Sequence, residues 1–598
     1  MTSRRRSVGA ELFAGGVSFR VWAPEHERVA VVIDGREYPL AREDGGYFCG
    51  VVANAKVGTR YRLRVDDERE TYPDPASRFQ PDGPDGDSVV VDPSAYEWRD
   101  AEWRGLQRKG LVLYELHIGT FTREGSYSAA AQRLGALAEI GINAIELMPV
   151  NEFAGTFGWG YDGVDLWAPT RLYGTPDELR RFVDEAHAHG IGVLLDVVYN
   201  HLGPDGCYLT KFAKEYFTDR YDNEWGDAVN FESEARTFFI ENAAYWIDEF
   251  HFDGLRIDAT QSMFDASETH VVREICDAAR AAAGGRSVVI VGENEPQQRR
   301  LLTRDGVDAL WNDDWHHAAH VALTGRAEAY YSDYRGTARE FAAMARLGFL
   351  YQGQRYRWQK KRRGTPSRDI APERLVCYLE NHDQVANSAR GERLQRLTSP
   401  ARFRAMTALL LLQPQTPLLF QGQERGSERP FLYFADHSGE LAEKVRSGRR
   451  DFLKQFPSID GATLTSPDDR ATFESCKLDD HGDPRVVQLH RDLLRLRREE
   501  PFVQQRSDWL EASTLSDDCL LLRWFTDDDR LLIVNLGRDL VLDPVPEPLL
   551  APPAGARDWT TLWSSEHPDY GGAGMQEVET ESGWHITGES AVVLRARM

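Results

Sequence analysis

The chain has few cysteines and no long apolar run, and both shortages exclude classes of protein. Its 598 residues include six cysteines, which are widely spaced and form no CxxC pair. This spacing disfavours a disulfide framework or a structural zinc site, so we expect a protein of a reducing, cytoplasmic compartment. The apolar run at residues 408–412 ends at Gln413 and Pro414, far short of the length that spans a membrane.

Positive charge is also scarce. The chain has 71 Lys and Arg against 95 Asp and Glu, which gives a formal net charge of −24. Because phosphate binding needs a concentrated basic surface, we expect no nucleic-acid partner, and we expect no membrane partner either. A neutral oligosaccharide needs no electrostatic steering and fits this balance. Aromatic residues reach 11% and offer flat faces to sugars, although most aromatic side chains belong to protein cores.

Changes in hydrophobic period divide the chain into domains. Residues 1–92 form short alternating runs, which predicts an N-terminal β-sandwich of the glucan-binding kind, and residues 93–110 are interpreted as a linker. From 111 to 505, apolar strands alternate with amphipathic helices. This pattern predicts an α/β fold, a (β/α)8 TIM barrel. Residues 506–598 return to short strands and predict a C-terminal β-sandwich.

The barrel segment contains the eight strands that such a fold needs. We expect strands at residues 112–118, 144–150, 193–198, 254–258, 288–292, 309–311, 375–379 and 417–420, and helices at 128–140, 176–189, 235–250 and 271–283. Two connections are long, at about 202–234 and 324–374. Long loops at the rim of a barrel usually shape a binding site.

Asp258 closes the strand-like run Gly254-Leu-Arg-Ile-Asp258. Positions two apart on a strand share a face, so Arg256 and Asp258 should point together. A neighbouring guanidinium lowers the pKa of a carboxyl and keeps it ionised, which is the state that a covalent glycosyl nucleophile requires. The alternative is a structural Arg–Asp pair at the rim of a barrel.

Glu293 ends a second apolar run, residues 288–292. A carboxyl among apolar neighbours has a raised pKa and can donate a proton near neutral pH. The alternatives are an ordinary rim glutamate that caps the next helix, and Glu295, two residues further along. Breaking a glycosidic bond needs one protonated and one ionised carboxyl, so the Asp258–Glu293 pair favours glycoside chemistry.

Two further strand ends carry polar clusters. The run Glu380-Asn-His-Asp383 places an imidazole beside a carboxylate, and both bind sugar hydroxyls well. Its alternative is a helix cap made by Asn381 or Asp383. The run from Asp196 to His201 ends the third strand with Asp, Asn and His. Ligands near it are too few for a metal site, so we expect neither a metal nor a cofactor.

Together, these four segments resemble the four signature regions of the α-amylase superfamily. The resemblance implies a retaining mechanism in which Asp258 is the nucleophile and Glu293 is the general acid and then base. Asp383 would be the third carboxylate, which stabilises the transition state by holding the sugar ring distorted. The resemblance also implies sugar contacts by Tyr161, His201, Arg256 and His382, and supporting roles for Asp196 and Asn200.

Over nearly the whole chain, a finer resemblance is to the maltooligosyltrehalose trehalohydrolases. It rests on residues 73–84, 113–119, 158–165, 311–317 and 381–393. It implies hydrolysis of the α-1,4 bond next to the terminal trehalose of maltooligosyltrehalose, in trehalose biosynthesis, and functional pairing with a maltooligosyltrehalose synthase. The alternatives are a 1,4-α-glucan branching enzyme, which is a transglycosylase, and a non-catalytic glucan-binding protein.

The segment Trp311-Asn-Asp-Asp-Trp-His-His317 begins where the sixth strand ends. It offers carboxylates and indoles on the leaving-group side of the scissile bond, where a trehalose unit would lie. We hypothesise that Asp314 or a close neighbour, Asp313 or Trp315, contacts that unit. The alternative is a helix start, with Asn312 or Asp313 as cap and Trp315 in the core.

Overall fold

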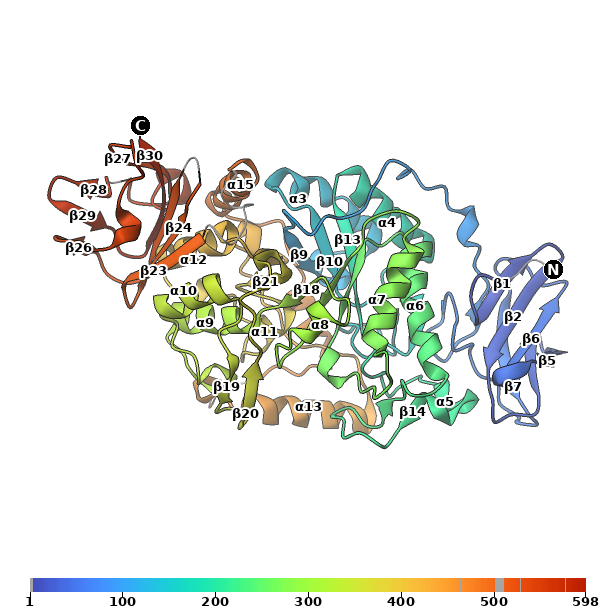
Figure 1. Cartoon of the computed structure of the whole chain (residues 1–598). Coiled ribbons are helices and arrows are strands. Elements are labelled where there is room, and N and C mark those ends of the chain that lie inside the picture. The colour runs from blue at the N-terminus through green and yellow to red at the C-terminus, as the bar shows by residue number, and fades with distance from the viewer. Residues whose placement is uncertain are drawn as a thin grey trace.

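A central barrel lies between two smaller β-rich domains at opposite ends of the molecule (Figure 1). The computed structural model describes residues 4–459, 461, 464–500, 510–526, 529–575 and 577–597. The predicted fold class, an α/β TIM barrel with terminal β domains, is confirmed. The boundary predicted between residues 505 and 506 lies outside the described residues, and the boundaries at 92 and 110 stay predictions.

Eight parallel strands close the barrel, each hydrogen-bonded to two neighbours. In barrel order they are β9 (Leu113–Leu116), β10 (Ala144–Leu147), β13 (Gly192–Val197), β16 (Gly254–Ile257), β17 (Val289–Gly292), β18 (Ala309–Trp311), β21 (Leu375–Tyr378) and β22 (Thr416–Phe420). Every residue of these strands is buried. Burial on both faces explains why the strands are nearly continuous apolar runs in the sequence.

Helices pack around the barrel. The principal ones are α4 (Pro176–Ala188), α6 (Ala235–Glu249), α7 (Val271–Ala282), α9 (Asp313–Thr324), α12 (Pro400–Leu412), α13 (Gly439–Leu453) and α15 (Pro484–Glu499). The side chain of Thr175 caps α4 and Glu178 completes a capping box. The single helix predicted at 128–140 is wrong in one respect, because it is divided into α2 (Tyr127–Ala131) and α3 (Leu134–Ile140).

Both long connections have secondary structure of their own. The first carries α5 (Leu209–Phe212) and the strand pair β14 (Phe217–Thr218) and β15 (Ala228–Val229). The second carries α10 (Ala338–Leu347) and the hairpin of β19 (Gln352–Tyr356) and β20 (Lys361–Gly364). Both follow the carboxyl ends of barrel strands, so they build the rim where a barrel enzyme holds its site.

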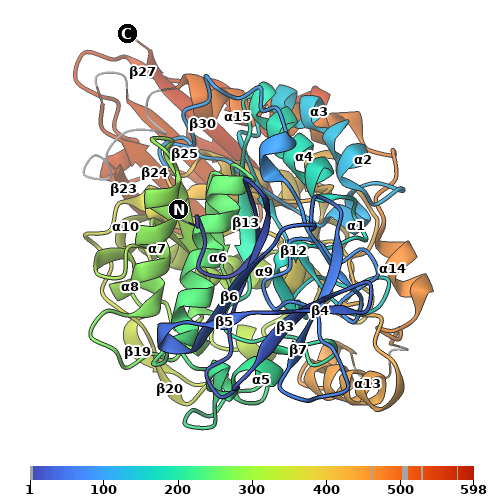
Figure 2. The same cartoon turned by 90° about the vertical axis from the view of Figure 1, so that its right-hand side faces the viewer.

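The N-terminal domain consists of two four-stranded antiparallel sheets that stand in front of α6 in Figure 2. Its strands are β1 (Gly9–Phe13), β2 (Gly16–Trp22), β3 (Val29–Ile33), β4 (Arg36–Pro39), β5 (Ala41–Arg42), β6 (Tyr47–Val52), β7 (Arg60–Val65) and β8 (Ser88–Val89). Arg6 pairs with Asp248 of α6 at 2.6 Å. Phe212, from the first rim connection, is buried inside this domain's hydrophobic core. The domain therefore supports a loop of the barrel rim.

The C-terminal domain has one five-stranded and one three-stranded sheet around a shared apolar core. Its strands are β23 (Leu510–Ser516), β24 (Cys519–Trp524), β25 (Arg530–Asn535), β26 (Leu540–Leu542), β27 (Asp558–Ser564), β28 (Glu579–Thr580), β29 (Gly583–Ile586) and β30 (Ser590–Arg597). None of the helices in the described ranges combines the length and apolarity that crossing a membrane requires.

A buried ionic network ties the segment between the first domain and the barrel to the barrel floor. His187 of α4 bonds Asp100 at 2.9 Å through Nδ1 and Asp253 at 2.8 Å through Nε2. Trp103 stacks on His187 and donates to Asp253. Burial lowers the pKa of His187, but Asp100 and Asp253 outweigh it and the net shift is upward. The pKa of Asp100 is lowered, because its bonds to His187 and His251 outweigh its burial.

This network should stabilise the fold most at mildly acidic pH. The contribution of His187 is complete below its ordinary value of 6.5 and is lost as pH rises through its raised pKa. The contribution of Asp100 is complete above 3.8 and is lost as pH falls through its lowered pKa. We expect Asp100→Asn to cost about 1.5–3 kcal/mol near pH 5.5 and less at pH 8. Calorimetry at both pH values, with Glu97→Gln as the control, measures this, and an equal loss at both would contradict it.

Candidate active site

The buried guanidinium of Arg256 gathers three carboxylates at one end of the barrel. Its Nη1 donates to Asp196 at 2.6 Å and to Asp258 at 2.7 Å, and its Nη2 donates to Glu293 at 2.6 Å. The side chain is 1% exposed and lies over the Trp311 ring at 4.2 Å. The expectation that Arg256 and Asp258 point together therefore agrees with the geometry. The residues of this cluster lie on, or directly after, β13, β16 and β17.

Asp258 follows the last residue of β16 and has donors on both carboxyl oxygens. Arg256 Nη1 donates to Oδ1, and Asn200 Nδ2 donates to Oδ2 at 2.7 Å. Burial would raise the pKa of Asp258, but Arg256, His201 and the Asn200 hydrogen bond lower it below its ordinary value. Asp258 is therefore ionised, which suits it to nucleophilic attack.

Glu293 follows Gly292, the last residue of β17, and its environment has the opposite effect. Its Oε2 accepts from Arg256 and, at 3.1 Å, from the backbone N–H of Ala259. Ala259 has φ of 39°, a strained conformation for a residue with a side chain. Burial raises the pKa of Glu293 well above its ordinary value, and nearby Asp258 adds to this while Arg256 opposes it. The pKa values of the two carboxyls are therefore shifted in opposite directions.

Asp383 lies in the first turn of a short helix, α11 (His382–Ala386), after β21. Asn381 caps this helix by accepting from Gln384 N at 2.8 Å, so the predicted capping alternative holds for Asn381. The far end of α11 is fixed by Arg449 of α13, which donates to Asn387 Oδ1 at 2.9 Å and to the carbonyl of Ala386. Asp383 is close enough to raise the pKa of Glu293.

Glu115 of β9 fixes both the backbone and the imidazole of His382. Its Nδ1 and its backbone N–H bond the two Glu115 oxygens at 2.5 and 2.9 Å. Burial lowers the pKa of His382, but the Glu115 carboxylate outweighs it, so the pKa is raised. Tyr161 stacks on His382 and donates to Asp196 at 2.6 Å. Sequence reasoning assigned Glu115 no role, although an acidic residue within an apolar strand was a usable signal.

His201 was predicted to contact the sugar, and it has a partner that was not predicted. The indole of Trp225 stacks on its ring at 4.6 Å and is 47% exposed, in the rim connection after β13. An exposed aromatic face beside the site offers a surface for sugar stacking. No periodic or motif signal in the sequence pointed to Trp225, because its position depends on how the long connection folds back.

The segment after β18 is mainly structural. Asp314 is fully buried, and its oxygens accept from Tyr334 OH, Arg363 Nε and two backbone N–H groups, at 2.6–2.9 Å. No lone pair is left for a sugar, which argues against Asp314 as the trehalose contact. Trp315 is buried and donates to Gln413, so its predicted core alternative holds. Asp313, at the start of α9, stays partly exposed and accepts from Tyr378 at 2.6 Å.

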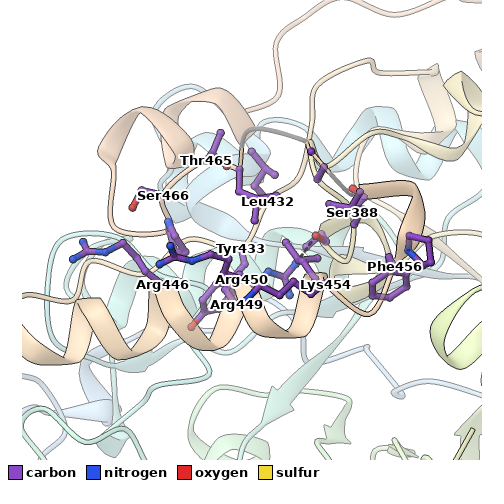
Figure 3. Close-up of a pocket in the computed structure, with 18 residues that line it drawn as sticks. Ser388, Leu432, Tyr433, Arg446, Arg449, Arg450, Lys454, Phe456, Thr465 and Ser466 are labelled. Atoms are coloured by element: carbon purple, nitrogen blue, oxygen red, sulfur yellow. Dashed lines mark hydrogen bonds between the residues drawn. The ribbon is translucent and has the colours of Figure 1, made fainter.

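A pocket of about 710 Å³ opens between α13 and the segments that follow β21 and β22. Figure 3 shows Tyr433, Phe456 and the basic side chains of α13 around it. Its volume falls within the roughly 300–1,000 Å³ of ligand pockets. Arg449 belongs both to this pocket and to the contacts that hold the far end of α11.

Within the part of the chain that the structure describes, no cluster of three or more His, Cys, Asp or Glu side chains is arranged to hold a metal ion. Asp196 and Asn200, the residues nearest to a metal-like set, are engaged by Arg256, Tyr161 and Asp258. The expected absence of a required metal stays a prediction.

Comparison with known proteins places this geometry in a family. Three family models match: carbohydrate-binding module 48 (isoamylase N-terminal domain) at residues 7–95, the alpha amylase catalytic domain at 117–227, and a domain of unknown function at 507–593. The malto-oligosyltrehalose trehalohydrolase of Deinococcus radiodurans is 39% identical over 90% of both chains. That of Saccharolobus solfataricus is 38% identical over 82% of this chain and 87% of the relative.

A solved structure is also similar to this chain over nearly its whole length. A crystal structure from Salmonella typhimurium, whose assignment as an alpha amylase is provisional, has a TM-score of 0.89 and 34% identity over 99% of this chain and all of its own. The barrel and its strand-end carboxylates define a glycoside hydrolase of the α-amylase superfamily. Within that class, the chain belongs to the malto-oligosyltrehalose trehalohydrolase family.

The opposed shifts of Asp258 and Glu293 predict a bell-shaped pH dependence of kcat/KM. The acidic limb should lie below the ordinary aspartate value and the alkaline limb above the ordinary glutamate value, as macroscopic constants of the pair. Asn200→Ala should raise the acidic limb by roughly one unit or more, because it removes a hydrogen bond to a charged group. Asn54→Ala, at an exposed site in the first domain, is the control. An unshifted limb in Asn200→Ala would count against ionised Asp258 as the essential base form.

Proposed function

We propose that the protein hydrolyses the α-1,4 bond next to the terminal trehalose of maltooligosyltrehalose, with retention of configuration. The observation that carries this is the Arg256 cluster, which holds Asp258 ionised beside a protonated Glu293. Retaining glycosidases require this division of roles between two carboxyls. The similarity to malto-oligosyltrehalose trehalohydrolases at 38–39% identity supports the substrate choice.

The reaction takes place in two steps. Asp258 attacks the anomeric carbon of the maltooligosyl unit while Glu293 protonates the departing oxygen, which releases trehalose. Glu293, now ionised, then removes a proton from water, which attacks the glycosyl–Asp258 ester and frees a maltooligosaccharide. Asp383 binds ring hydroxyls and favours the distorted ring, and His201, His382 and Tyr161 line the same sugar position. Asp196 and Asn200 hold Arg256 and Asp258 in place.

The position of Glu293 fixes the direction of the substrate. Because Glu293 protonates the leaving oxygen, the trehalose unit lies on the side of β17 and β18, where Asp313 begins α9. The maltooligosyl chain then runs the other way, into the pocket between α13 and the segments after β21 and β22 (Figure 3). Tyr433 and Phe456 offer apolar faces there, and Arg449 offers N–H donors to hydroxyls.

The chemistry also implies a supplier, since maltooligosyltrehalose must be made by rearrangement of a maltooligosaccharide end, the reaction of a maltooligosyltrehalose synthase. All six cysteines carry free thiols, which favours the proposed cytoplasmic location. A glucan branching enzyme from Pseudoalteromonas atlantica is 33% identical, but the match covers only 43% of this chain. Branching is therefore the competing outcome of the assay below.

Incubation with maltooligosyltrehalose should release free trehalose and an initially α-configured maltooligosaccharide, detected by NMR. Asp258→Asn should lower turnover by roughly 10⁴-fold or more, as loss of a catalytic nucleophile does. Glu293→Gln should be as damaging on the natural substrate but milder with an activated aryl leaving group, which needs little protonation. Glu295→Gln is the matched control. Transfer to glucan without free trehalose would indicate branching, and near-normal turnover by either variant would overturn the assignment of roles.

Asp313 is the member of the 311–317 segment that remains available to the trehalose unit. Burial raises its pKa to about 6, with Arg363 opposing, so it can donate or accept near neutral pH. We expect Asp313→Ala to cost about 1–3 kcal/mol in kcat/KM for maltooligosyltrehalose and far less for a plain maltooligosaccharide. Asp314→Asn, by contrast, should lower thermal stability without changing the ratio of the two substrates. Equal losses on both substrates in Asp313→Ala would place the selectivity elsewhere.

A further inference from the structure

Two glutamates stand side by side in the barrel wall beneath the site. Glu115 of β9 and Glu146 of β10 are register partners on adjacent parallel strands, and each is 1% exposed. Register partners project from the same face of a sheet, and neighbouring strands lie roughly 4.8 Å apart. The two carboxyl groups are therefore close neighbours in a dry interior. The strands even share a pattern, Leu-Tyr-Glu115-Leu and Ala-Ile-Glu146-Leu.

The two carboxyls are used differently. Glu115 accepts two hydrogen bonds from His382, one on each oxygen. Both oxygens of Glu146 and Nε1 of Trp311 are buried and make no hydrogen bond of good geometry among the described residues, although the Trp311 indole lies close enough to oppose the rise in the pKa of Glu146. An ionised carboxylate in such a place would carry an uncompensated charge, which costs several kcal/mol. A neutral carboxylic acid would not.

The charged groups around Glu146 also favour its neutral form. The carboxyl groups of Glu115 on β9 and Asp196 on β13 lie near it, and the guanidinium of Arg256 on β16 acts against them. Arg256 already serves three carboxylates. Burial, with Glu115 and then Asp196 adding to it, raises the pKa of Glu146 well above its ordinary value, and Arg256 offsets only part of this. The Trp311 indole from β18 is the remaining polar neighbour.

We propose that Glu146 is a neutral carboxylic acid that acts as a positioning residue, donating its proton to the Glu115 carboxylate. The pair then carries one negative charge, which faces the His382 imidazolium. A carboxylate has about four acceptor positions, so Glu115 has room for this third hydrogen bond. Nothing is transferred: the proton stays on Glu146, and the chain runs from Glu146 through Glu115 to His382. Buried carboxyls in contact commonly share one proton in this way.

The consequence lies at the sugar position. A charge-assisted hydrogen bond from Glu146 fixes the Glu115 carboxylate, and Glu115 in turn raises the pKa of His382 and fixes its orientation. His382 can then donate from Nε2 to a substrate hydroxyl. This inference concerns proton placement beneath the site and stands whether the aglycone is trehalose or another glucan unit.

Two variants of nearly equal size test it. Glu146→Gln keeps an N–H donor and neutrality, so kcat/KM and its pH profile should stay within about threefold of wild type. Glu146→Met removes the donor, so the hold of Glu115 on His382 should weaken and the pKa of His382 should fall. We expect kcat/KM to fall roughly ten- to hundredfold, with little change in KM for activated substrates. The alkaline limb should move about one unit lower, because it then reports deprotonation of His382 rather than of Glu293.

A direct readout keeps the proposal testable if Glu146→Met fails to fold. The infrared difference between wild type and Glu146→Gln at neutral pH should show loss of a protonated carboxylic acid band. Loss of carboxylate bands instead would show that Glu146 is ionised and would overturn the proposal. The proposal would also be overturned if both variants had wild-type kcat/KM, or if Glu146→Gln lowered kcat/KM and shifted the pH profile as much as Glu146→Met.

Discussion

The ion-pair cluster around Arg256 is the constraint on which the rest of the site depends. One fully buried guanidinium joins carboxylates from three successive strands. Because a buried cation is tolerated only when it is fully compensated, the three carboxylates and the arginine must be placed together. Gly254 lets β16 approach β17 closely, since a side chain there would collide with the backbone of Val289. The close pairing of these barrel strands therefore also sets the positions of the three carboxylates.

The carboxyls around this cation outnumber it, and their environments shift their pKa values in opposite directions. Burial would raise the pKa of Asp258, but Arg256 and Asn200 lower it, whereas burial raises the pKa of Glu293 despite Arg256. In the barrel wall beneath them, His382 donates to both oxygens of Glu115, while burial raises the pKa of Glu146. The direction of each shift thus follows from burial set against the donors that reach the carboxyl. The outer parts stabilise the rim: Arg449 holds α11, and the N-terminal domain encloses Phe212.

Much of the architecture was readable because each barrel strand is buried on both faces. Such strands are continuous apolar runs, and the ends of all eight expected strands lie within three residues of their predicted positions. Charged residues at the ends of those runs pointed to Asp258, Glu293 and Asp383 for the same reason. The prediction of one helix at 128–140 was wrong, because apolar periodicity continues through the break at Gln132 and Arg133.

The sequence by itself determined the fold class, the strand-end carboxylates and the family, since these depend on local period and on residue types at fixed spacing. Tertiary structure alone decided which residues share a partner. Asp314 was a reasonable sugar ligand by type, yet Tyr334 and Arg363 take its oxygens from 20 and 49 residues away. Glu146 and Trp225 gain significance only from neighbours that folding brings to them. Which donors reach a side chain, and how deeply it is buried, depend on residues that are distant in the sequence, so the spacing of residues along the chain does not reveal them.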